Sequence, residues 1–232
     1  MPESNSTPST PKPARKSRIK RSAQDQQIAN EISTAEQAIT GAMEQTDVLA
    51  RLKPRSYDEK ELKKGLSLQE AAQEAFNTRQ QRAGTAAQAK QMRDTAEKTA
   101  REQFSDYRQT CQANYLRRDD RKALGASGRV PTDIEKFITT ARAAYTAAGQ
   151  VPYGDTLAVY GYDEEKLKEA FVGLASVAEA EGEYRARAGE AKGATKDRDT
   201  AHREMKKWFG KFKKIAKLAL KGQPGLREML KI

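Results

Sequence analysis

The residues of this sequence that could most plainly do chemistry are its clustered cations. A lysine-rich stretch, KKWFGKFKKIAKLALK, runs from Lys206 to Lys221. Ammonium groups at helical spacing can hold phosphates, so this stretch could meet a nucleic acid, an anionic lipid surface or an acidic protein. A second basic cluster, KPARKSRIKR, lies near the N-terminus. The candidate anion- or partner-binding residues are the cations of these two segments: Lys12, Arg15, Lys16, Arg18, Lys20, Arg21, Lys206, Lys207, Lys211, Lys213, Lys214, Lys217 and Lys221.

The net charge of the chain is concentrated in the same two segments. Residues 1–21 carry six Lys or Arg against Glu3, a charge of +5, and residues 203–221 carry eight against Glu204, a charge of +7. Because the whole chain carries +11, the remainder sums to −1. Two cationic segments on a nearly neutral body are typical of an electrostatic attachment site, although charge that serves solubility gives the same pattern.

The residue types of familiar catalytic and metal sites are scarce. The single histidine, His202, and the single cysteine, Cys111, cannot assemble a Cys/His metal site, and no phosphate-cradling glycine pattern occurs. Cys111 lies on an apolar helical stripe with no histidine available as its base, so we interpret it as a small core residue. We therefore expect no enzymatic activity, no cofactor, no metal and no small-molecule substrate.

The composition predicts an all-α protein. Alanine, glutamate, lysine, arginine and glutamine are abundant, aromatic residues make up 6% of the chain, and runs of β-branched residues are scarce. No apolar run approaches the length of a transmembrane helix, and the N-terminus lacks the apolar stretch of a signal peptide. Together with the single cysteine, which suits a reducing compartment, this pattern favours a cytoplasmic location.

An internal repeat organises most of the chain. Aligned without a gap, residues 32–127 and 137–232 share 22 identities in 96 positions. Chance agreement would not place several local motifs in one register, so we expect two structurally equivalent halves. Three motif pairs share the offset of 105 residues: SYDEKELK from Ser56 with GYDEEKLK from Gly161, RAGTA from Arg82 with RAGEA from Arg187, and RDTA from Arg93 with RDTA from Arg198.

The repeat and the composition predict three regions. Residues 1–22 combine Pro, Ser, Thr and basic residues with almost nothing apolar, which predicts a disordered basic tail. Residues 23–128 and residues 129–232 are then expected to form one helical bundle each. The predicted architecture is two tandem antiparallel helical bundles related by the internal repeat.

Each half contains one helical segment of unusual length, which has no proline after the Tyr-Asp-Glu motif. We expect a tight reversal at Gly84 and at Gly189, which occupy matching positions, because a folded-back hairpin buries apolar stripes that a lone helix would expose. Capping boxes are expected at two helix starts, with Ser56 and Glu59 at one and Thr132 and Glu135 at the other.

The lysine-rich stretch is itself amphipathic. On a helical wheel Trp208, Phe209 and Phe212 share one apolar face with their neighbours, and the lysines fill the rest. The equivalent positions of the first half keep a weaker apolar stripe, but their opposite face is of mixed charge and includes Glu102 and Asp106. Because the stripe recurs, we expect it to pack in the core and the lysines to form an exposed basic face.

The motifs YGYDEEKL, DRDTA, WFGKFKKIAKLAL and QPGLREML together resemble a loosely described group of uncharacterised bacterial proteins. That group is built from tandem helical bundles and ends in a Trp-containing helix and a Pro-Leu-rich terminus. The resemblance covers the second half well and the first half faintly, since Gln103 stands in place of Trp208 and Asp119 in place of Pro224. It implies an all-helical fold with no assigned activity and transfers no functional residue.

The first-ranked functional prediction is a non-enzymatic structural or interaction protein whose helical bundles present surfaces to protein partners or to further copies of the chain. The alternative is a nucleic-acid-associated protein that binds phosphates through the tail and the lysine-rich helix. Such binding would be non-specific, because no base-reading motif accompanies the cations. An anionic membrane surface ranks third among the partners.

Overall fold

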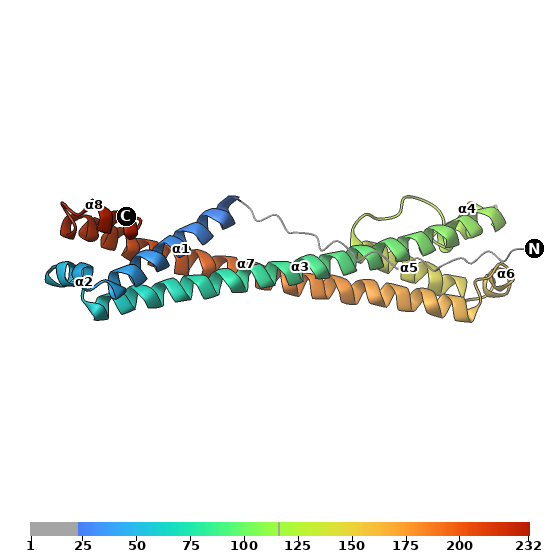
Figure 1. Cartoon of the computed structure of the whole chain (residues 1–232). Coiled ribbons are helices and arrows are strands. Elements are labelled where there is room, and N and C mark those ends of the chain that lie inside the picture. Colours follow the sequence, from blue (N-terminus) through green and yellow to red (C-terminus); the bar gives the residue numbers. More distant parts are fainter. Residues whose placement is uncertain (1–22, 116) are drawn as a thin grey trace, which may run out of the picture. The chain divides into compact units, whose positions relative to one another are not determined.

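The computed structural model describes residues 23–115 and 117–232, whose course is shown in Figure 1. All regular elements among these residues are helical, which confirms the all-α prediction. The predicted disordered tail, residues 1–22, lies outside the described residues. None of the described helices combines the length and the apolar character needed to cross a membrane. In chain order the elements are α1 (Ala23–Glu44), α2 (Thr46–Leu52), the 3-10 helix η1 (Lys53–Arg55), α3 (Glu59–Asn114), α4 (Arg118–Ala123), α5 (Ile134–Ala148), α6 (Gly154–Val159), α7 (Glu164–Ala219) and α8 (Pro224–Met229).

Two helices of 56 residues each, α3 and α7, contain more of the chain than all the others. Gly84 lies inside α3 and Gly189 lies inside α7, so the predicted reversal at these glycines is wrong. A glycine in a helix interior costs only about 1 kcal/mol relative to alanine, and neither helix contains a proline. Both helices therefore continue through the position at which a hairpin was expected.

The contacts divide the chain into two compact units. Unit 1 comprises the residues up to Gln69 together with Lys206–Ile232, and unit 2 comprises Glu70–Met205. Unit 1 therefore holds the beginning of α3 and the end of α7, and unit 2 holds the end of α3 and the beginning of α7. This division differs from the predicted boundary after residue 128, since each predicted bundle contributes helices to both units.

Within each unit the two long helices pack in antiparallel order. In unit 2 Arg82 Nη1 lies 2.8 Å from Glu190 Oε2 and Arg93 Nη1 lies 3.3 Å from Glu181 Oε2, so residue numbers fall along α7 as they rise along α3. In unit 1 the Nε1–H of Trp208 on α7 donates to Glu61 Oε1 at the beginning of α3, at 2.8 Å. Each long helix thus packs against the long helix of the other repeat, which takes the place of the second arm of the expected hairpin.

The offset seen in the sequence is also the offset between corresponding helices. The first and last residues of α3 and of α7 differ by 105 positions at both ends. Burial follows the same offset, which indicates that equivalent residues serve equivalent packing roles. Buried pairs of one residue type include Leu52 and Leu157, Leu62 and Leu167, and Phe104 and Phe209.

Aspartates cap the helix starts. Asp58 Oδ1 accepts the backbone N–H of Glu61 at 2.9 Å, and the equivalent Asp163 Oδ1 accepts that of Lys166 at 2.8 Å. Asp133 caps α5 in the same way. The predicted caps Ser56 and Thr132 are therefore wrong, because a cap must directly precede the first helical residue; Ser56 instead ends η1 with a left-handed backbone, φ 64°.

Each unit has an aromatic core. In unit 1 the rings of Trp208 and Phe212 stack with centroids 5.5 Å apart, and Tyr57 packs against both. In unit 2 Tyr145 packs edge-on against Phe104 and Tyr107, with centroids 5.7 and 5.0 Å away. Trp208 is only 8% exposed and Phe212 is fully buried, which confirms that the apolar stripe of the lysine-rich helix packs in the core.

Candidate anion-binding surface

Seven lysines of unit 1 form the candidate site, which we call the lysine surface: Lys206, Lys207, Lys211, Lys213, Lys214, Lys217 and Lys221. The first six lie on α7, and Lys221 follows the end of that helix. Lys213 is half-buried and the other six are exposed. At 100° and 1.5 Å per residue, the helical members span an arc of about 160° and a length of about 17 Å.

The packing of α7 fixes the direction in which these lysines point. The Trp208 ring lies directly on Gly65 of α3, where an added Cβ would stand 2.1 Å from a ring carbon. Only glycine leaves room for the ring at this approach, so the pair sets the rotation of α7 about its axis. With Trp208 and Phe212 held inward, the opposite face of the helix is directed to solvent.

Two members of the lysine surface have partners within unit 1. Lys206 Nζ lies 3.0 Å from Glu31 Oε1 of α1, and Lys213 Nζ lies 4.8 Å from the ring centroid of Phe209. The other five have no ion pair with a carboxylate among the described residues. Their charges lie close together along the end of α7, so the potential at this face is positive.

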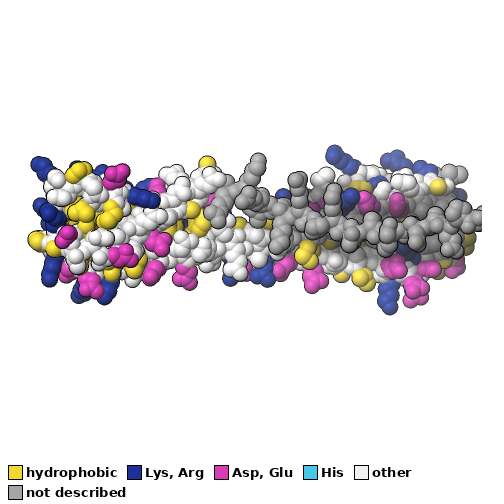
Figure 2. Space-filling model, viewed as in Figure 1, with side chains coloured by type: hydrophobic (Ala, Val, Ile, Leu, Met, Phe, Trp, Pro, Cys, Tyr) yellow, Lys and Arg dark blue, Asp and Glu magenta, His cyan; other side chains and the backbone are white. Residues whose placement is uncertain are grey.

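The charge of the two units differs. In unit 1 residues 23–69 and 206–232 carry fifteen Lys and Arg against nine Asp and Glu, a net charge of +6. Unit 2 carries twenty-two of each, a net charge of zero. Figure 2 shows Lys and Arg side chains gathered at the end of unit 1 that bears α2 and α8. The excess positive charge of the described residues is therefore a property of unit 1.

The helix face of unit 2 that is equivalent to the lysine surface lies at the end of α3, and its two arginines bond to the protein's own chain. Arg101 Nη1 donates to the carbonyl of Pro131 at 2.7 Å, and Arg108 Nε donates to that of Gly125 at 3.0 Å. Both carbonyls belong to the segment that connects α4 to α5. The residues equivalent to the six helical lysines have no net charge: Arg101, Glu102, Asp106, Arg108, Gln109 and Gln112.

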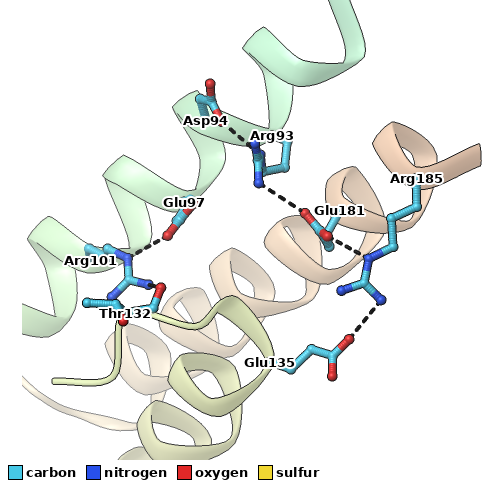
Figure 3. Close-up of polar contacts among 8 residues, drawn as sticks. All are labelled: Arg93, Asp94, Glu97, Arg101, Thr132, Glu135, Glu181 and Arg185. Carbon is cyan, nitrogen blue, oxygen red and sulfur yellow. Dashed lines mark hydrogen bonds and ion pairs between the residues drawn. The ribbon is translucent and has the colours of Figure 1, made fainter. Parts of the chain in front are cut away.

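Other arginines of unit 2 are engaged by carboxylates, as Figure 3 shows. Arg93 Nη1 lies 3.3 Å from Glu181 Oε2, and Arg185 Nε lies 2.6 Å from the other oxygen of the same carboxylate. Arg185 Nη1 also lies 2.8 Å from Glu135 Oε1 of α5. These guanidinium groups join helices to one another, so they are not available as a free cationic surface.

The residues considered for other chemistry do not form a site. Cys111 is fully buried, and burial raises the pKa of its thiol, whereas a reactive cysteine needs a lowered pKa. The interpretation of Cys111 as a core residue is therefore confirmed. His202 lies half-buried on α7. Within residues 23–115 and 117–232, no three His, Cys, Asp or Glu side chains are grouped to hold a metal ion.

The structure thus brings the seven predicted lysines of the C-terminal segment together on one unit. The six predicted cations of the tail, Lys12, Arg15, Lys16, Arg18, Lys20 and Arg21, lie outside the described residues. Unit 1 has further exposed cations outside the predicted segments, such as Lys53 and Arg55 of η1. Helical periodicity gave no signal for them, because a helix of three residues is too short to show an amphipathic face. Figure 1 places α2, which precedes them, at the same end of unit 1 as α8.

Comparisons of the chain with protein-family models, with curated proteins and with solved structures found no match. The resemblance to bacterial tandem helical-bundle proteins therefore stays a prediction.

Proposed function

We propose that this protein is a non-enzymatic interaction protein that binds a phosphate-bearing polyanion through the lysine surface of unit 1. The observation that carries the proposal is the contrast between two equivalent helix faces. At the end of α7 the face carries six lysines and a net positive charge. At the end of α3 the equivalent face is neutral, and both of its arginines donate hydrogen bonds to the protein's own chain.

Lysines on a rigid helix suit contact with repeated phosphates. Each ammonium group is a compact, strongly hydrated charge without the planar donor fork of arginine, so the contact depends on charge and spacing rather than on ligand sequence. On duplex DNA each neutralised phosphate lowers the slope of log affinity against log salt by about 0.9. The five lysines without a described carboxylate partner therefore predict a slope contribution of about −4.5.

The test is the binding of a short DNA duplex to the full chain, measured by fluorescence anisotropy between about 50 and 200 mM salt. The triple variant Lys211→Glu, Lys214→Glu and Lys217→Glu should bind roughly a hundredfold more weakly, and its salt slope should be smaller by about three. Circular dichroism checks that the variant remains helical.

The matched control reverses three exposed lysines of unit 2: Lys90→Glu, Lys192→Glu and Lys196→Glu. This variant has the same net charge as the first, so the comparison separates a defined surface from a general effect of charge. We expect it to bind the duplex within about threefold of the unaltered chain, because distant exposed charges are screened. An equal loss in both triple variants would contradict the assignment of binding to the lysine surface.

A protein partner or further copies of the chain remain predictions, as does a cytoplasmic location. An acidic protein would also present negative charges to the lysine surface. The duplex experiment therefore tests whether this surface binds a polyanion, and it does not identify the natural partner. Sedimentation of the full chain measures self-association directly, and a monomer at all concentrations would contradict the prediction of a homo-oligomer.

A further inference from the structure

Helix α6 of unit 2 and the residues beside it expose apolar side chains. Val159, the last residue of this helix, is 82% exposed, Tyr160 directly after it is 50% exposed, and Val151 before the helix is 93% exposed. Leu157 is fully buried, and Val159 two positions later is directed to the opposite side of the helix. We call Val151, Val159 and Tyr160 the α6 surface. Exposed apolar side chains that gather on one short element are typical of a docking surface.

The equivalent turn of unit 1 has no such surface. The positions 105 residues earlier hold no exposed aromatic or branched aliphatic side chain, since they are Thr46, Pro54 and Arg55. The anchoring leucines of the two turns, Leu52 and Leu157, do correspond, and both are fully buried. The fold of this turn therefore does not require the exposed valines and tyrosine of unit 2.

The α6 surface is bordered by carboxylates. Residues 149–165 contain four Asp or Glu and no Lys or Arg, a net charge of −4, whereas the equivalent residues 44–60 contain four of each sign. Asp155 precedes Val159 by four positions and so lies on the same face of α6, and Glu164 begins α7 shortly after this helix ends. Within residues 23–115 and 117–232, neither Asp155 nor Glu164 forms an ion pair.

The lysine surface surrounds one apolar side chain that phosphate binding does not explain. Leu218 is 56% exposed, because it lies two positions after the buried Ala216 and so on the opposite side of α7. Lys214 and Lys211 precede it by four and seven residues on the same face. The equivalent residue of unit 2 is only Ala113. A phosphate gains nothing from leucine, whereas an apolar patch of a protein buries it favourably.

We infer that the lysine surface of one copy of this chain binds the α6 surface of a second copy. The two surfaces are complementary in both properties, since one is a leucine bordered by cations and the other is a set of apolar side chains bordered by carboxylates. Two α6 surfaces would bring carboxylates together, and two lysine surfaces would bring ammonium groups together. The contact is therefore between unlike surfaces, and each pair of copies leaves one surface of each kind free for a further copy.

Sedimentation velocity of the full chain measures this contact. A polyanion competes for the lysine surface, so the protein is first freed of nucleic acid. At about 50 mM salt the average mass should rise between about 5 and 200 µM protein, the range in which small interfaces associate. At about 500 mM salt it should rise much less, because salt screens the charges. A monomer throughout, or equal association at both salt concentrations, would overturn the inference.

Two variants that keep the net charge test the two surfaces. Val159→Ser with Tyr160→Ser alters the α6 surface, and Leu218→Ser alters the lysine surface. Each variant alone should self-associate roughly tenfold more weakly, because every contact that it makes includes one altered surface. Val172→Ser, at a side chain of unit 2 that is 64% exposed, is the control and should associate as the unaltered chain does. Circular dichroism checks that each variant remains helical.

A single substitution outside the helices supports the double variant. Val151→Ser alters the α6 surface without touching α6, so it tests the same contact if the double variant is unfolded. It should weaken self-association by about threefold. Unchanged association in this variant and in Leu218→Ser would overturn the inference.

An equal mixture of the α6 double variant and the Leu218 variant gives the sharpest result. The first keeps an unaltered lysine surface and the second keeps an unaltered α6 surface, so one intact contact forms between them. The mixture should therefore give a 1:1 dimer with the affinity of the unaltered contact and no larger species. No recovery in the mixture, or weaker association in only one of the two variants, would overturn the inference.

Duplex binding separates this inference from the proposed function. Leu218→Ser keeps all seven lysines, so it should bind a short DNA duplex within about threefold of the unaltered chain while its self-association falls. A chain that associates through these surfaces but binds no duplex contradicts the proposed function and leaves the inference standing. A chain that binds duplex but stays monomeric does the reverse.

Discussion

Unit 1 and unit 2 are assembled from corresponding helices, yet one presents an excess of positive charge and the other is neutral. Their buried positions have kept residue types in common, such as Leu62 with Leu167 and Phe104 with Phe209. Their exposed positions have not, since Lys207 corresponds to Glu102 and Lys211 to Asp106. The cost of changing an exposed charge is small, so a duplicated scaffold can acquire a binding surface in one unit without disturbing the packing of either.

The two cores also achieve similar packing by different means. In unit 2 the hydroxyl of the buried Tyr107 lies 3.2 Å from the carbonyl oxygens of Leu124 and Ala144, to which it donates. The equivalent residue in unit 1 is Phe212, which has no hydroxyl and stacks on Trp208 instead. Unit 2 thus relies in part on a buried polar contact, whereas unit 1 relies on an aromatic stack and the close approach of Gly65.

The largest effect should come from removing the aromatic stack of unit 1. Phe212→Ala should lower the free energy of unfolding by about 3–5 kcal/mol, because it leaves a cavity beneath Trp208. Urea titration followed by the fluorescence of Trp208, the single tryptophan, measures the change. Leu218→Ala on the same helix is the control, and its effect should stay within about 0.5 kcal/mol because the side chain is exposed. Similar losses in both variants would contradict the burial of Phe212.

A smaller effect should follow from adding one methyl group at the contact of α3 with α7. Gly65→Ala should lower the free energy of unfolding by about 1–2 kcal/mol, since the strain against the Trp208 ring exceeds the gain in helix propensity. The same urea titration measures it.

Gly84→Ala, within the same helix, is the control for that variant. A Cβ at position 84 would meet nothing within 4 Å, so alanine should raise the free energy of unfolding by up to about 1 kcal/mol. A loss of stability here would show that the chain reverses at Gly84 and that α3 is not continuous.

The smallest effect concerns the polar contact of unit 2. Tyr107→Phe should lower the free energy of unfolding by about 1 kcal/mol, because two buried carbonyls lose their donor while the ring packing remains. Burial raises the pKa of Tyr107, so the hydroxyl stays protonated and donates throughout the usual pH range. Thermal or urea unfolding followed by circular dichroism measures the loss. Tyr160→Phe, at a half-exposed tyrosine, should leave the free energy of unfolding unchanged. An equal loss in both variants would contradict a specific contribution from the buried hydroxyl of Tyr107.

Sequence periodicity predicted much of this structure, because it reports which face of a helix is buried. It placed Trp208 and Phe212 in the core and the lysines outside, and the repeat gave the offset between α3 and α7. It did not predict which helix covers each face, because that partner lies far away in the chain. Gly84 was misinterpreted for a related reason: one glycine is compatible with a turn and with a helix interior, and local sequence does not decide between them.

The candidate site was predicted in part. Spacing alone placed the C-terminal lysines on one exposed face. It did not show that Arg101 and Arg108 on the equivalent face of unit 2 are engaged, because their carbonyl partners lie in an irregular segment. Backbone acceptors carry no sequence signal, so this contrast emerged only from the structure. The cap at Asp133 was missed because Thr132 beside it is also a favoured cap, and only the start of α5 selects between them.

The passage of α3 and α7 through both units has a consequence for synthesis on the ribosome. All residues of unit 2 precede Lys206, so they leave the ribosome before the C-terminal part of unit 1 does. The core of unit 1 needs Trp208, Phe212 and Leu230 from the other end of the chain. Helix α1 is translated early but lacks these packing partners until the C-terminal segment emerges. During that interval its isoleucines are exposed to chaperones or to other nascent chains.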